Sequence, residues 1–151
     1  LSVTLKFWFA RGCSAPGGGV GGGRHWYSAV LGSAYNVGSS WGPTGVTLSL
    51  PGAGTYLLLA QGNATLGLPG STCNIQIRIY NTTDSAQVGP PAYCVTARSS
   101  DSSQIFGTGV VAYVWTVTGA KSVRIEAQHT DLMGPSLAQI LDCTFTYLKL
   151  E

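Results

Sequence analysis

The sequence predicts an all-β protein, an antiparallel jelly-roll sandwich, and three observations support this. Charged residues make up only 9% of the 151-residue chain, 21 residues are glycine, and short runs of alternating apolar and polar residues recur between turn residues. A helix in water needs a charged outer face and loses stability with glycine, whereas a sheet covers its wet face with Thr, Ser, Asn and Gln and places glycine in turns. Low charge and high glycine content therefore favour strands.

Eight runs carry the alternation or the apolar content expected of strands. Two short turns, PGAG at 51–54 and TGAK at 118–121, are predicted to connect neighbouring strands, the second as the turn of a hairpin across 110–128. No helix is expected, because Gly134 and Pro135 interrupt the one segment with helical spacing. Short strands without crossover helices indicate a double antiparallel sheet. The expected strands lie at 27–31, 46–50, 55–60, 74–80, 92–98, 109–117, 122–129 and 140–150.

Residues 1–25 are predicted to form an N-terminal arm, and residues 26–151 a single head domain. Residues 1–10 alternate loosely, but the following SAPGGGVGGGRHW is rich in glycine and has nothing with which to bury a core. No Gly-Lys-Ser/Thr ending follows the glycines, so a phosphate-binding loop is not expected. We expect the arm to be separable from the head and to grip neighbouring molecules.

The charge and the hydropathy of the chain exclude two classes of partner. The net charge is +2, with eight basic and six acidic residues scattered along the chain, so no basic patch is available for nucleic acid. No apolar run approaches the length of about 18 residues that a membrane span needs, so membrane insertion is not expected. Low charge leaves surface suited to subunit contacts, because charged side chains are depleted from interface cores.

The reactive side chains are too few and too scattered to predict an active site. The chain has two histidines, six carboxylates and no C-x-x-C pair, so neither catalysis, a metal cluster nor a cofactor is expected. Cys13, Cys73, Cys94 and Cys143 are interpreted either as buried thiols or as one or two disulfides.

Recognition is expected at loop tips, since loops at the end of a sandwich vary freely while strands hold them. The candidates are two aromatic residues, Tyr35 and Trp41, and two loop carboxylates, Asp84 in NTTDS and Asp101 in SSDSSQ. These two carboxylates would bind calcium only if their loops converged at one end of the sandwich, which no sequence pattern establishes.

The run IQIRIYNTTD predicts a strand with one buried face. Ile75, Ile77 and Ile79 alternate with polar or amphipathic residues, so the isoleucines are expected to face the core and Arg78 to face outward. Arg78 at a subunit boundary would suit a carboxylate such as Glu126. The side chains of the following turn, 81–84, are expected to cap their own backbone.

The ordered set of motifs resembles the tumour-necrosis-factor-like and complement-type globular heads, as found at bacteriophage fibre tips and in virion surface proteins. The resemblance spans about 26–150. It implies a trimer in which the last strand runs through the centre, with Arg78, Trp115, Glu126 and Tyr147 as interface candidates. The segments that carry it are GTYLLLA at 54–60, IQIRIYNTTDSAQV at 75–88, VVAYVWTVTGAKSVRIEAQ at 110–128 and TFTYLKL at 144–150.

The resemblance implies a non-enzymatic structural protein on the virion surface. Such a head would either attach the particle to a host, as a tail-fibre or spike tip, or decorate and stabilise a capsid. Its expected partners are two further copies of itself, other capsid or tail proteins, and a host cell-surface glycan or protein. The alternative is a secreted, complement-like sugar-binding module, and the glycosylation acceptors at Asn63 and Asn81 matter only in that case.

Overall fold

The computed structural model describes residues 26–69, 72–98, 103–130 and 135–150. The predicted arm at 1–25 lies outside these ranges, and so does Asp101. Within them, all regular structure is strand, and no helix could cross a membrane. Each of the eight expected runs overlaps a strand. The nine strands are β1 (Trp26–Val30), β2 (Tyr35–Asn36), β3 (Gly42–Leu50), β4 (Gly54–Pro69), β5 (Cys73–Asn81), β6 (Ala86–Ala97), β7 (Ile105–Val117), β8 (Lys121–Thr130) and β9 (Pro135–Lys149).

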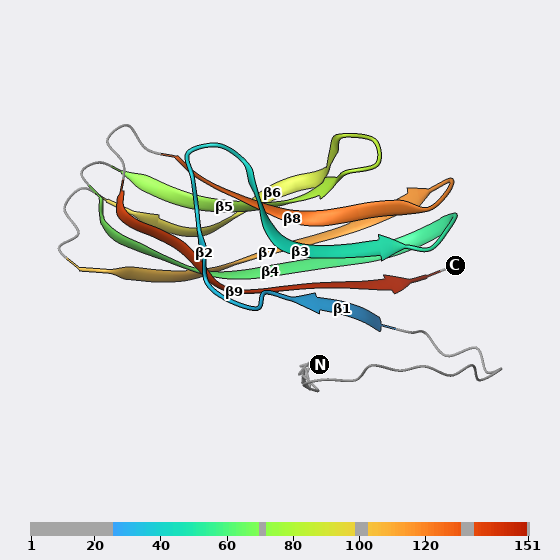
Figure 1. Ribbon diagram of the computed structural model, residues 1–151, viewed down its shortest axis with the longest axis horizontal. Helices are drawn as coiled ribbons and strands as arrows, with labels where there is room; N and C mark the ends of the chain where they lie inside the picture. The colour runs from blue at the N-terminus through green and yellow to red at the C-terminus, as the bar shows by residue number, and fades with distance from the viewer. Residues whose placement is uncertain (1–25, 70–71, 99–102, 131–134, 151) are drawn as a thin grey trace, which may run out of the picture.

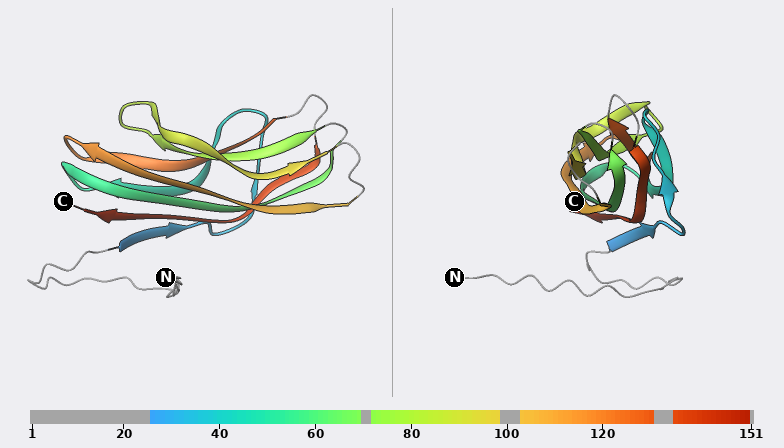
Figure 2. Two further views of the ribbon diagram at one scale, coloured as in Figure 1. Left: turned by 180° about the vertical axis from the view of Figure 1, so that it is seen from behind. Right: turned by 90° about the vertical axis from the view of Figure 1, so that its left-hand side faces the viewer.

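The strands form two antiparallel sheets packed face to face, as the sequence predicts (Figure 1). Sheet I has the order β1-β9-β4-β7, and the short β2 also pairs with β9. Sheet II has the order β3-β8-β5-β6. An end-on view shows the two sheets wrapped around a common interior (Figure 2). This is a jelly roll, in which strands far apart in the sequence become neighbours.

The predicted hairpin across 110–128 is wrong. Its two strands, β7 and β8, belong to different sheets, and so do β3 and β4 on either side of the PGAG turn. Both turns therefore pass the chain from one sheet to the other at the end of the sandwich. Only β5 and β6 are consecutive strands that pair with each other. Turn residues specify that a chain reverses, but they do not specify which strand it then pairs with.

The strand β5 shows why the two sheets stay together. Ile75, Ile77 and Ile79 are fully buried, while the residues between them are half-buried on the outer face, as predicted. The isoleucines belong to the same core as Leu58 and Phe145 of sheet I, which are also fully buried. Each such side chain contributes on the order of 1.5–3 kcal/mol by leaving water.

Glycines bring β6 and β7 together where the edges of the two sheets meet. A Cβ at Gly107 would overlap the carbonyl oxygen of Cys94, and one at Gly109 would lie 2.7 Å from the Cys94 sulfur. Gly89 has a φ of +69°, and a Cβ there would lie 2.7 Å from the ring of Tyr113. The sandwich closes on this side because a glycine lies at each of these contacts, at 107 and 109 on β7 and at 89 on β6.

We predict that Gly107→Ala destabilises the fold, because the new methyl group would force two backbones apart. Overpacking of this kind costs about 1–3 kcal/mol. Gly119→Ala is the matched control, since a Cβ there meets no atom within 4 Å. Thermal unfolding should show a melting temperature several degrees lower for Gly107→Ala and an unchanged or slightly higher one for the control. Equal melting temperatures would mean that the strands are not in close contact here.

Candidate functional site

The outer face of sheet I is apolar across four neighbouring strands. In register, Trp26 of β1 lies opposite Leu148 of β9, which lies opposite Leu57 of β4, which lies opposite Val114 of β7. We call this surface the apolar face. It consists of Trp26, Val30, Leu57, Leu59, Phe106, Val110, Ala112, Val114 and Leu148. Val30 is 67% exposed, Phe106 64% and Val110 55%, although all three are large and apolar.

A short polar row crosses the outer face of sheet I between Phe106 and Val110. Asn63 of β4 accepts a 2.6 Å hydrogen bond from the Thr108 hydroxyl and donates one of 3.4 Å to Asp142 of β9. Elsewhere on this face the polar side chains are uncharged, as in the 2.9 Å hydrogen bond between the hydroxyls of Ser28 and Thr146. The outer face of sheet I therefore exposes very few charged side chains.

The outer face of sheet II has the opposite character, because a group we call the arginine cluster lies at its centre. It comprises Trp41, Arg78, Tyr80, Arg124 and Glu126. Glu126 is only 3% exposed. Arg78 donates to its Oε2 from Nε at 2.9 Å and from Nη2 at 2.7 Å, and Arg124 donates to its Oε1 from Nε at 2.9 Å and from Nη2 at 2.6 Å.

Aromatic rings hold the two guanidinium groups in place. The Arg78 guanidinium carbon lies 4.4 Å from the ring centre of Trp41 and 4.9 Å from that of Tyr80. Arg124 lies over the same Tyr80 ring at 5.4 Å. Cation–π contacts at these distances are attractive and restrict the side chains. The predicted pairing of Arg78 with Glu126 is present, but it forms within one chain.

Sequence reasoning missed Arg124 and Tyr80, although a signal for both was available. Arg124 and Glu126 alternate with buried residues in VRIEAQ, which places them on one face of β8. Tyr80 and Arg78 alternate in the same way on β5. What the sequence did not show is that β5 and β8 are neighbours, with Arg78 opposite Glu126 and Tyr80 opposite Arg124.

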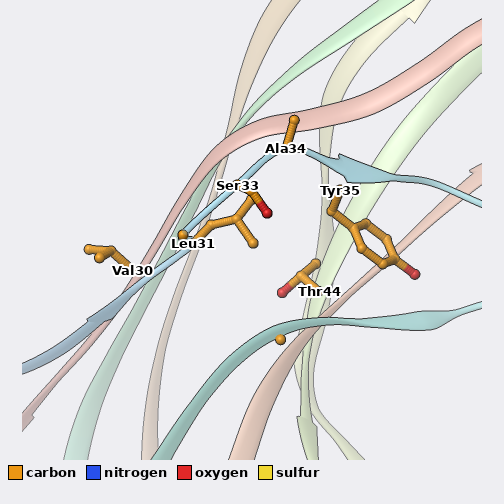
Figure 3. Close-up of a pocket in the computed structure, with 8 residues that line it drawn as sticks. Val30, Leu31, Ser33, Ala34, Tyr35 and Thr44 are labelled. Carbon is orange, nitrogen blue, oxygen red and sulfur yellow. The ribbon is translucent and has the colours of Figure 1, made fainter.

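The two predicted loop aromatics are not free loop tips. Trp41 is half-buried and contacts Arg78 through its ring. Tyr35 lies in β2, half-buried, with its hydroxyl so close to Gly42 that a Cβ there would lie 2.5 Å away. Tyr35 also lines a hollow of about 220 Å³ beside β1 and β3, across which Leu31 and Thr44 face each other (Figure 3). The hollow offers a ligand only apolar groups, backbone and hydroxyls.

Asp84 lies in the turn between β5 and β6, as predicted, but its carboxylate is engaged within the chain. Lys121 donates to it at 2.6 and 2.9 Å, and the amide of Asn81 donates at 2.7 Å. Asn81 is 1% exposed, and its Oδ1 accepts hydrogen bonds from the backbone N–H groups of Thr83 and Asp84, which confirms the predicted capping. The turn is thereby tied to the start of β8.

Asp84 precedes strand β6, whereas Asp101, outside the described residues, follows that strand in the sequence. β6 has 12 residues, from Ala86 to Ala97, and spans roughly 40 Å at about 3.3 Å per residue. Asp84 therefore does not lie at the end from which the chain continues toward Asp101. Among the described residues, no three His, Cys, Asp or Glu side chains are grouped closely enough to hold a metal ion.

The remaining interface candidates, Trp115 and Tyr147, point toward the interior. Tyr147 is 4% exposed and its ring stacks on that of Tyr27 at 4.8 Å, while the ring of Tyr56 meets it edge-on. Trp115 of β7 lies opposite Tyr56 of β4 and is half-buried against the core. A contact of either residue with another subunit stays a prediction.

Three of the four cysteines are described and all three are buried, with Cys94 and Cys143 as free thiols. Burial raises the pKa of the Cys94 thiol to about 11, and burial together with the neighbouring Cys94 and Asp142 raises the pKa of the Cys143 thiol to about 12. Because the thiolate is the reactive form, these thiols are unreactive while the chain is folded.

Comparisons with known proteins establish the fold and nothing finer. No family model and no curated protein matches the chain. The structure resembles the globular domain of zebrafish complement 1qA protein, with 12% identity, a TM-score of 0.53, and coverage of 85% of this chain and 98% of that domain. It is also similar to the Eiger TNF of S. frugiperda, at 10% identity and a TM-score of 0.49, over 83% and 93% of the two chains. The chain therefore has the jelly-roll fold seen in the complement-type globular domain.

We predict that the carboxylate of Asp84 stabilises the fold only above about pH 4. Hydrogen bonds from Lys121, and then from Asn81, hold the pKa of Asp84 below its usual 3.8. A lowered folded-state pKa gives stability that is present above the unfolded-state pKa and is lost as the pH falls through the folded-state pKa. Asp84→Asn should therefore melt below the parent at pH 7, and the difference should shrink progressively as the pH falls below 3.8. Lys121→Met should reproduce the loss at pH 7; a parent-like melt of both variants would refute the assignment.

We also predict that the described thiols resist modification in the native state. In a Cys13→Ser background, Ellman's reagent should react with no thiol at pH 8 and with three thiols once guanidinium unfolds the chain. The measurement is the absorbance released with time. Rapid release of one or more equivalents from the folded protein would contradict the burial of Cys73, Cys94 and Cys143.

Proposed function

We propose that this chain is the trimeric, non-enzymatic head of a virion surface protein, which attaches the particle to its host or reinforces a capsid. The observation that carries the proposal is the apolar face. An isolated chain would expose Val110 and Val114 to water, together with the apolar row that continues from Val114 through Leu57 to Trp26, and it would expose Val30 and Phe106 separately. Contiguous apolar surface of this kind marks an interaction site in a soluble protein.

A further copy of the chain is the partner that this face suits best. The apolar face carries no charge that a hetero-partner would need to match, and the polar row has a single carboxylate, Asp142, already bonded to Asn63. Three copies follow from the resemblance of the sequence to trimeric heads, in which the last strand runs through the centre. β9 is an inner strand of sheet I and contributes Leu148 to the face.

The viral setting is supported by the motifs that resemble phage and virion heads. The secreted alternative loses one of its supports, because Asn81 is 1% exposed and bonded to Asp84. The other glycosylation acceptor, Asn63, lies in the polar row on the outer face of sheet I, where a glycan would obstruct assembly. We therefore favour the virion surface as the location of the chain.

We predict that Val114→Asp dissociates the assembly, because it buries an unpaired charge in the subunit contact. Light scattering should give about three times 15.7 kDa for the parent and about 15.7 kDa for the variant. Ser49→Asp, which adds the same charge to an exposed position on the outer face of sheet II, is the control and should stay trimeric. A monomeric parent would refute the trimeric head.

The viral setting has its own test. Antibodies raised against the purified head should label intact particles of the parent virus in electron micrographs, at the fibre tips or over the capsid. Labelling at the tips indicates attachment, and labelling over the shell indicates decoration. Particles that contain the chain but remain unlabelled would refute a surface location.

A further inference from the structure

The charged side chains of the described residues are gathered on the second sheet. Of the eight charged residues in the described ranges, three lie in the arginine cluster and two more, Asp84 and Lys121, at the end of the same sheet. If the apolar face of sheet I is buried in a trimer, the outer face of sheet II points away from the axis in every subunit. It is then the broad surface that the assembly presents to a target.

The arginine cluster carries an excess of positive charge. Two guanidinium groups share one carboxylate, and both oxygens of Glu126 are used. An arginine has five N–H groups, and Arg124 directs two of them at Glu126. The other N–H groups of Arg124 bond no acceptor in the described part of the chain, and the Arg124 side chain is 32% exposed. Arg78 keeps one weak additional contact, 3.4 Å from Nη1 to Gln87.

The cluster is held rigid before any ligand arrives. Glu126 accepts hydrogen bonds from both guanidinium groups. The ring of Tyr80 lies against both arginines, and the ring of Trp41 also lies against Arg78. Side chains that are already ordered lose little conformational entropy on binding, so more of the interaction energy appears as affinity. A planar guanidinium group with free N–H donors fits the two oxygens of a carboxylate, or those of a sulfate.

The surroundings of the cluster suit a sugar ring. Gln76 lies beside Arg78 on β5, and its cross-strand neighbours are Gln128 on β8 and Tyr93 on β6. Tyr93 is 63% exposed, although it is large and aromatic. Amide groups can exchange hydrogen bonds with sugar hydroxyls, and an exposed ring can pack against the apolar side of a pyranose.

We propose that the outer face of sheet II binds an acidic saccharide, with its carboxylate or sulfate on Arg124 and Arg78 and its ring near Tyr93. This assignment rests on the proposed attachment function and names the class of its receptor. It places recognition on a sheet face and not at the predicted loop tips. Three such sites on one trimer would convert weak individual binding into useful avidity on a surface dense in acidic glycans.

The test is a titration of the full-length protein with three small sugars: 3′-sialyllactose, lactose 3′-sulfate and lactose. Binding is monitored by saturation-transfer NMR and by the Nε–H signals of Arg78 and Arg124. We expect both acidic sugars to bind with dissociation constants on the order of millimolar and lactose to bind at least about tenfold more weakly. Binding of the acidic sugars should weaken between low salt and physiological salt.

Two variants of equal charge assign the site. Arg124→Gln should weaken the binding of both acidic sugars about tenfold or more. Lys149→Gln should leave their binding unchanged, because the Lys149 ammonium group lies elsewhere, near Ala53 and Tyr56. Tyr93→Ala changes an exposed position, so it should weaken the binding of the acidic sugars without affecting the melting temperature. This variant keeps the test decisive if Arg124→Gln fails to fold.

Failure of parent binding at about 10 mM acidic sugar, equal affinity for lactose, or equal effects of the two charge variants would overturn the proposal. Equal affinity for free acetate or sulfate would overturn its saccharide part. The proposed trimer is judged separately by light scattering. A monomer that binds acidic sugar through Arg124 would support this site and refute the trimeric head. A trimer that binds no acidic sugar would support the trimeric head and refute this site.

Discussion

The packing of the two sheets against each other is the constraint on which the rest of this structure depends. Ile75, Ile77 and Ile79 are fully buried between the sheets, so the residues that alternate with them on β5 must face outward. A shift of one residue would bury Arg78 and expose the isoleucines. The position of the arginine cluster is thus a consequence of core packing. The glycines of β7 serve the same packing, because they let the edge of sheet II close over sheet I.

A sandwich that is held together from inside can give its two outer faces different chemistry. Sheet I presents an apolar face with little charge, while sheet II presents two arginines around one buried carboxylate. The low overall charge of the chain makes this division sharp. The proposed subunit contact and the proposed saccharide site thus lie on opposite faces of the sandwich.

Order also extends into the turns, and this changes what they can do. The turn between β5 and β6 is tied down by Asn81, Asp84 and Lys121, and the segment before β3 places Trp41 against Arg78. Side chains that are engaged within the chain have fewer groups left for a receptor. Of the side chains predicted from their loop positions to bind a partner, Trp41 and Asp84 are engaged in contacts within the head.

The sequence by itself determined the class of fold, the approximate positions of eight of the nine described strands, and the side of β5 that faces the core. These follow from local alternation and turn composition, which act over a few residues. It also indicated the Arg78–Glu126 pair, because both residues lie on outward positions of their strands. Only the tertiary structure decided that β7 and β8 lie in different sheets, that Tyr80 and Arg124 complete the arginine cluster, and that the apolar residues of β1, β4, β7 and β9 form one surface. The reason is physical: strand pairing in a jelly roll joins residues far apart in the chain, and no local pattern records which distant strand becomes a neighbour.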